Sequence, residues 1–359
     1  MRSQFKNLAK FGLLITTALN LTSCNIDDPS AGPFQFSVVD IQDILSEDDI
    51  MIWGSYQENN LPEKAENIHL FIGESYEKGV VMQNHGKQWL FEAGKNPKWP
   101  MGENHFNCYL KAISPAQHES FKIVQIPYKE QEYKTILAEI SIPFDVSKHK
   151  DIKVGFSTLL NYTFYSSCLT KYEGSLLFTH ILSQVKFTGI SYSKTQSLSL
   201  SSIEIVNVHR QGFSGSMPEA VCTQLDKAKN RFTAMLANET VLNETSKQEL
   251  THPQFPLIML PQTVAKWTTT AKNPVPTSEA DANHNSYLKL VCTIYDKATG
   301  DTIANDLPVF IPFDVKWKKN YQYEYTILFG KESACFDQDG NALNNIPIQI
   351  ESKQSPWEP

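Results

Sequence analysis

The sequence predicts an all-β protein built from antiparallel β-sandwiches, and three observations point to this fold class. Apolar and polar residues alternate with a period of two in many short segments, which is typical of strands with one buried face. Helical periodicity is almost absent, and only residues 218–228 have a helical pattern. Asn, Asp, Gly and Pro residues separate the short segments, as turns do in sandwich folds.

The clearest alternation lies in YQYEYTILF, residues 321–329. One face carries Tyr321, Tyr323, Tyr325, Ile327 and Phe329. We expect this face to be buried and the opposite face, with Gln322 and Glu324, to be exposed. The other expected strands are residues 34–39, 68–72, 88–91, 106–113, 121–126, 136–144, 152–163, 176–192, 198–208, 255–260, 287–295, 307–313 and 346–350.

The N-terminus has the features of a secretory signal peptide: a basic start, a short apolar stretch at residues 11–19, and small residues before Cys24. The apolar stretch is about half the length of about 20 residues that a membrane span needs. The sequence Leu21-Thr22-Ser23-Cys24 resembles the bacterial lipobox, in which the cysteine is acylated. We therefore predict lipidation at Cys24; the alternative is a plain signal peptide with a chance cysteine.

Two acidic residues close behind the cysteine suggest where the lipid holds the protein. Asp27 and Asp28 resemble the acidic surface-export signal of Bacteroidetes lipoproteins. The match rests on these two residues alone, and two acidic residues are also common in linkers. It favours attachment to the outer face of the cell outer membrane, with the N-terminal lipid as the contact.

Length and charge predict two domains and argue against nucleic acid as a partner. Cleavage before Cys24 leaves 336 residues (359 − 23), and the motif IPFDV occurs at residues 142–146 and 311–315. We expect a signal peptide at 1–23, a tether at 24–33, and sandwiches at 34–173 and 174–359. Loss of three basic residues moves the formal charge from −7 to −10, which does not suit nucleic acid.

The sequence shows no catalytic or cofactor motif, so we expect no enzyme, no catalytic residues and no cofactor. H-E-x-x-H, G-x-S-x-G and a phosphate-binding glycine loop do not occur. The acidic run at residues 47–49 is interpreted as a solvated loop rather than as paired catalytic acids. His180 is flanked by apolar strand residues and is predicted to be a packed or edge histidine.

We also expect no metal site. Asp337, Asp339 and Asn341 could be read as calcium ligands, but the loop lacks the third ligand and the final Glu of an EF-hand. Asp339-Gly340 is instead typical of a hairpin turn. The cysteines that remain after Cys24 form no C-x-x-C pair, which argues against zinc; they are Cys108, Cys168, Cys222, Cys292 and Cys335.

Two of these cysteines and three of the tryptophans are predicted to lie in the core. Cys108 and Cys292 occupy inward positions of alternating strands, which indicates buried small hydrophobes rather than a disulfide. Trp89, Trp267 and Trp317 lie in or beside strands. Core packing is the simpler interpretation of these tryptophans, and an aromatic platform for sugars is the alternative.

Several segments match a known family in the same order along the chain. They are KWPMGENHFNCYLKAISP (98–115), DIKVGFS (151–157), SLLFTHILSQVKFTG (175–189), MLPQTV (259–264), WKKNYQYEYTILF (317–329) and FDQDGNALNNIPIQIESKQSPW (336–357). By these segments the chain resembles the fimbrillin family of Bacteroidetes surface lipoproteins, the subunits of type V pili. The resemblance implies two tandem transthyretin-like β-sandwiches and a structural or adhesive role.

The resemblance also implies partners and a way of binding them. The partners would be other fimbrillin-like pilus subunits, with host or bacterial surface ligands as further targets. Stalk subunits of the family polymerise by strand exchange after a protease cuts behind a basic residue near the end of the first strand. Ile346, Ile348 and Ile350 form the candidate exchange strand, and Pro347 would confine it to a sheet edge.

The chain departs from the stalk pattern because it has no Lys or Arg between Phe11 and Glu63, so Lys64 is the first basic residue after the signal. We therefore expect a permanently lipidated anchor or accessory subunit, or a fimbrillin-like lipoprotein that does not polymerise. A surface glycan-binding lipoprotein that serves polysaccharide uptake is the alternative function.

Overall fold

The structure is a computed structural model, and it describes residues 35–38, 48–58, 68–73, 75, 78–85, 89–91, 105–125, 137–163, 171–174, 176–214, 223–224, 230–237, 240–242, 245–268 and 285–357. Within these residues the chain is nearly all β, and the single helical element is the 3-10 helix η3 (Val146–Lys148). The predicted all-β fold class is therefore confirmed. No helix in this part of the chain is long and apolar enough to cross a membrane.

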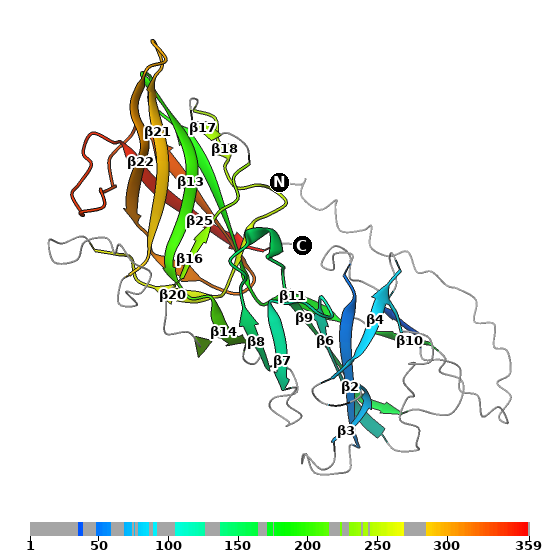
Figure 1. Cartoon of the computed structure of the whole chain (residues 1–359). Helices are drawn as coiled ribbons and strands as arrows, with labels where there is room; N and C mark the ends of the chain where they lie inside the picture. The colour runs from blue at the N-terminus through cyan, green and yellow to red at the C-terminus, as the bar shows by residue number, and fades with distance from the viewer. Residues whose placement is uncertain are drawn as a thin grey trace, which may run out of the picture.

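Most strands after residue 182 form two facing sheets (Figure 1). The β24 sheet contains, in spatial order, β18 (Gln248–Glu249), β12 (Ser183–Ser191), β24 (Tyr321–Phe329) and β25 (Ile348–Pro356), with β19 (Leu257–Met259) also paired to β12. The β13 sheet contains β16 (Asn230–Thr233), β13 (Gln196–Val208), β21 (Tyr287–Asp296) and β22 (Thr302–Pro312), with β17 (Thr240–Leu242) beside β13. The short strands β20 (Gln262–Val264) and β23 (Val315–Trp317) pair with each other.

The alternation predicted for residues 321–329 builds the core between these sheets. Tyr323, Tyr325 and every second residue after them are buried, while Tyr321 packs partly buried at the rim. The ring of Tyr325 meets Phe313 edge to face, with 4.5 Å between the centroids. The β13 sheet contributes Leu198, Leu200, Ile203, Ile205, Leu288, Leu290 and Ile294 to the same cluster. The predicted inward face is therefore confirmed, whereas Gln322 and Glu324 on the opposite face are half-buried rather than exposed.

In the first half, a large sheet has strands buried on both faces. Its order is β11 (Leu177–His180), β9 (Lys153–Thr163), β6 (His105–Ser114), β2 (Ile50–Glu58), β4 (Val80–Asn84) and β5 (Trp89–Phe91), with β3 (Ile68–Ile72) paired to β2. On β2, Ile50 and Ile52 pack in one cluster, and Met51 and Trp53 pack in the main core. A central strand buried on both faces shows no alternation, which is why the sequence did not predict β2.

Strand pairing continues from one half of the chain into the other. β14 (Gln211–Ser214) and β15 (Thr223–Gln224) join β8 (Leu137–Ser141) and β7 (Phe121–Gln125) in one sheet. β1 (Gln35–Val38) pairs in parallel with β10 (Lys171–Gly174), which spans the expected boundary between residues 173 and 174. β11 pairs with β9 of the first half. The division at this boundary stays a prediction.

Three sequence expectations need correction. Residues 176–192 form two strands rather than one, because the chain leaves β11 and enters the other half as β12 at Ile181–Leu182. Thr223–Gln224 lie in strand β15, so the helix predicted at residues 218–228 is wrong there, and its other residues lie outside the described part. The strand expected at residues 346–350 is observed at Ile348–Pro356.

Candidate functional site: the C-terminal edge strand

The C-terminal strand β25 is the outermost strand of the β24 sheet within the described residues. It pairs antiparallel with β24 over nine residues, from Ile348 opposite Phe329 to Pro356 opposite Tyr321. Of the candidate exchange residues, Ile348 and Ile350 lie in the strand, whereas Ile346 precedes it. The strand extends beyond the predicted end at residue 350. Its second part is polar and shows no apolar alternation, so only its backbone pairing with β24 defines it as a strand.

Side-chain burial is confined to the beginning of β25. Ile346 and Ile348 are buried, and Ile350 packs partly buried against the core. Every residue from Glu351 to Pro356 is exposed. The second part of the strand is therefore held by backbone hydrogen bonds rather than by apolar burial. Backbone pairing combined with a few apolar anchors is how an added strand is recognised at a sheet edge.

Trp357 anchors the far end of β25 to strand β11, which pairs with β9 of the first half. Its indole stacks on the imidazole of His180, with 4.1 Å between the centroids and 9° between the planes. Its backbone N–H donates to the carbonyl of Asn320 at 2.9 Å. His180 is buried on β11, and its Nδ1 lies 2.7 Å from the carboxylate of Asp151, which also pairs with Lys153. The prediction of a packed histidine is confirmed.

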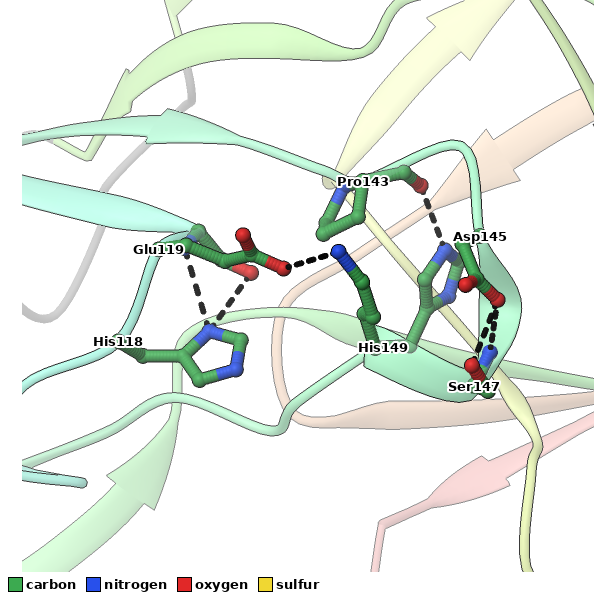
Figure 2. A network of polar contacts seen from close by, with 8 residues as sticks. His118, Glu119, Pro143, Asp145, Ser147 and His149 are labelled. Atoms are coloured by element: carbon green, nitrogen blue, oxygen red, sulfur yellow. Dashed lines mark hydrogen bonds and ion pairs between the residues drawn. The ribbon is translucent and has the colours of Figure 1, made fainter.

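His149, whose bond to Pro143 is drawn in Figure 2, makes a second tie between the halves. Its Nε2 donates to the carbonyl of Pro143 at 2.9 Å, and its Nδ1 accepts from the N–H of Ile258 on β19 at 3.0 Å. This arrangement requires the neutral Nε2–H tautomer. Burial lowers the pKa of His149 from 6.5 to about 4, which agrees with a neutral ring. The segment is turned toward β19 by η3, whose start is capped by the Asp145 side chain.

Arg210 adds a third tie in the chain segment between β13 and β14. Its Nε donates to the carbonyl of Ile142 at 2.8 Å, and its Nη2 donates to Oγ of Ser141 at 2.9 Å. Its guanidinium carbon lies 4.4 Å from the ring centroid of Phe144. Together with the pairing of β14 and β8, these contacts hold the first half against the sandwich that carries β25.

Cys292, Trp89, Trp267 and Trp317 lie in the core as predicted. Cys292 and Cys335 are buried and free, and burial raises the pKa of the Cys292 thiol to about 12. Trp89, Trp267 and Trp317 are buried. Buried side chains cannot form the alternative sugar platform. The lipidation residue Cys24, the side chain of Cys108, and residues Cys168 and Cys222 lie outside the described part.

The loop at residues 336–342 is a turn, as predicted. Asp337 accepts hydrogen bonds from the backbone N–H groups of Asp339 and Asn341 at 2.9 and 2.8 Å. Gly340 adopts a φ of 83°, and a bridge between Phe336 and Ala342 closes the loop. The Asp337 carboxylate is thus used within the turn. No group of three metal-ligating side chains occurs in the described ranges.

The acidic residues before β2 also make structural contacts. Asp48 pairs with Lys150, with 2.8 Å between the charged atoms. Asp49 accepts a hydrogen bond from the backbone N–H of Asn84 at 2.9 Å. These contacts agree with the loop interpretation. Glu47 lies outside the described residues.

Comparison with known proteins decides the family. The sequence profile described as fimbrillin-like matches residues 41–357. The chain belongs to the fimbrillin-like family. Membership points to a structural protein of fimbriae rather than to an enzyme. No curated protein matches the sequence.

Solved structures of fimbrial proteins are similar to this fimbrillin-like chain. A fimbrial protein from Bacteroides vulgatus ATCC 8482 is similar with a TM-score of 0.52 at 10% identity, over 86% of this chain and 93% of that chain. The fimbrial anchor protein Mfa2 from Porphyromonas gingivalis has a TM-score of 0.36 at 9% identity, over 89% and 95% of the two chains. Only the first similarity is strong enough to support the shared fold.

Sequence reasoning missed the residues that tie β25 and the two halves together. Trp357 was noted only as part of the family ending, and its contact with His180 joins residues 177 positions apart (357 − 180). His149 gave no signal in the sequence. Arg210 could have been noticed as one of only three arginines in the chain, because a rare Arg in an otherwise Lys-rich sequence often serves directed hydrogen bonding.

Proposed function

We propose that this fimbrillin-like chain is a lipid-anchored anchor or accessory subunit of a type V pilus at the cell outer membrane. Cys24 holds it in the membrane, and other fimbrillin-like subunits bind it by strand exchange that uses Ile346, Ile348 and Ile350. The observation that carries the anchor role is the absence of Lys and Arg between Phe11 and Glu63. A trypsin-like protease needs a basic side chain in its specificity pocket.

Without cleavage, the first strand stays in place. β1 pairs with β10 along residues 35–38, and no basic residue between β1 and the end of β2 offers a cut. The groove that a neighbour would fill in a stalk subunit then remains occupied. The chain can still contribute its own edge strand β25 to one neighbour. One contact of this kind suits an anchor or an accessory position but not a growing filament.

Mass spectrometry of the protein from intact cells tests this role. We expect an N-terminus at acylated Cys24. A dominant N-terminus just after Lys64, together with ladders of detergent-resistant oligomers, would contradict the anchor role and favour a stalk subunit. Asp40→Arg provides a control, because it places a basic residue just after β1. If the protease is present in the same cells, this variant alone should lose its first strand.

The lipid is tested separately by Cys24→Ala. We expect the variant to take up no radiolabelled fatty acid and to move from the membrane to the soluble fraction, because the substitution removes the cysteine that carries the lipid. Ser23→Ala serves as a control that keeps both a small residue and the cysteine. Fatty acid incorporation into Cys24→Ala, or none into the unmodified protein, would contradict lipidation at Cys24.

A further inference from the structure

Among the described residues, two long strands, β22 and β25, end their sheets, and only β22 has a protected outer edge. The outer side of β22 is interrupted by Asp306, whose φ is 46°, and by Pro308, and Phe310 is bridged to Phe336. Irregular backbone, proline and coverage are the usual means by which proteins block a free edge. The other long edge, β25, has neither proline nor a positive φ from Ile350 to Ser355.

The register of β25 shows which of its backbone groups face outward. Gly330 N–H donates to the carbonyl of Pro347, so the odd-numbered residues of β25 bond to β24. The N–H and C=O groups of Ile350, Ser352 and Gln354 therefore point away from β24. In the described chain, the outer side is covered only at the start, where Ala334 N–H donates to the carbonyl of Ile348.

We propose that a second copy of this chain pairs with the outer edge of β25 in an antiparallel, two-fold symmetric arrangement. In the proposed register Ser352 lies opposite Ser352 of the other copy, and Ile350 lies opposite Gln354. These pairs consist of residues whose backbone groups face outward. A two-fold interface of this kind closes after two copies.

Charge complementarity selects the register and the partner. With Ser352 at the two-fold axis, Glu351 of each copy lies opposite Lys353 of the other, on one face of the sheet. Both are non-hydrogen-bonded positions, where side chains of antiparallel strands approach most closely. Sliding one strand by two residues in either direction places Glu351 opposite Glu351 or Lys353 opposite Lys353, and like charges directly opposite each other are destabilising. An unpaired lysine on an edge strand would repel a second copy. Here the charge of Lys353 is offset by Glu351 of the other copy.

Sedimentation velocity of the purified full chain tests the pairing. We expect a monomer–dimer equilibrium that weakens as salt is raised, because the paired charges are exposed. Glu351→Lys should weaken the dimer at least about tenfold, since two like-charged pairs replace two attractive ones. The double exchange Glu351→Lys with Lys353→Glu should restore it. Thermal midpoints show whether the exchange disturbs the fold, because Lys353 also lies opposite Glu324 on β24.

A cysteine trap tests the register. Ser352→Cys should form an intermolecular disulfide under mild oxidation, because opposed Cα atoms at hydrogen-bonded positions lie about 5.5 Å apart, within disulfide range. Gln354→Cys is the matched control, since residue 354 opposes residue 350 and not itself. A monomer at all concentrations, a dimer indifferent to the charge exchange, or equal crosslinking of both cysteine variants would overturn the proposal. None of these results depends on lipidation or strand exchange, because the purified chain, with no other subunit present, keeps β25 in its own sheet.

Discussion

Replacing Tyr325 by alanine is expected to lower the free energy of unfolding by about 3–5 kcal/mol, the usual cost of removing a large aromatic side chain from a core. Tyr325 is 4% exposed and packs against Phe313 and Phe187, with 4.5 and 5.9 Å between the ring centroids. Its hydroxyl accepts a hydrogen bond from Nε1 of Trp317 at 3.0 Å. The substitution therefore leaves a cavity and also a buried indole N–H without its partner.

Urea denaturation of Tyr325→Ala and of Glu324→Ala measures this difference on adjacent residues. Glu324 lies on the outer face of β24, where its partner is Lys247 in an exposed ion pair. Its replacement should change the free energy of unfolding by only about 0.5 kcal/mol. Similar denaturation midpoints for the two variants would show that the inward face of β24 is assigned wrongly.

Strands whose sequence alternates between apolar and polar residues could be predicted. β3 and β24 match their predicted ranges, and β6, β9, β13 and β21 differ by two residues or fewer at their ends. Strands without this contrast could not be predicted. β2 is buried on both faces, and most of β25 is exposed on both faces. Without alternation the period-two signal is absent, and only pairing with neighbouring strands defines such segments.

The candidate site also combines residues that a sequence pattern predicts with residues that only long-range contacts define. Ile346, Ile348 and Ile350 could be selected from the sequence, because their spacing fits one face and Pro347 favours an edge. The strand's polar extension and its anchoring by Trp357 on His180 depend on pairing with residues far away in the chain. The helix expected at residues 218–228 failed at β15 for a related reason. Pairing of Thr223–Gln224 with β14 overrides the local pattern there.

Lowering the pH from about 6.5 to about 4 is expected to destabilise the protein through His149. The folded pKa of His149 is about 4 because burial disfavours the charged ring, against an ordinary value of 6.5. In this window the unfolded chain binds a proton that the folded chain does not bind, so stability falls as the pH falls. The contribution is fully present above pH 6.5. A difference between 6.5 and about 4 corresponds to about 3 kcal/mol.

The physical cause is the tie between the two halves of the chain. A protonated Nδ1 cannot accept the N–H of Ile258, and the charge would be buried beside the ring of Phe232, 5.9 Å away between centroids. The hydrogen bond to the Pro143 carbonyl, and after it the charge of Asp145, favour the charged ring, but burial outweighs both. The carboxyl pKa of Asp145 is held below 3.8 by hydrogen bonds from Ser147. The Asp145 carboxylate therefore stays ionised between pH 6.5 and about 4, and the stability that it contributes is lost only at lower pH.

Unfolding free energies of the unmodified protein and of His149→Gln, measured between pH 7 and pH 4, test this assignment. A glutamine can accept from Ile258 and donate to Pro143 without titrating, so the variant should lose most of the pH dependence that His149 causes. His118, whose pKa is also lowered by burial, contributes equally to both proteins and cancels in the comparison. His69→Gln, on the exposed side of β3, controls for the substitution itself. Parallel pH profiles for His149→Gln and the unmodified protein would show that the imidazole of His149 is not the group that makes the junction sensitive to acid.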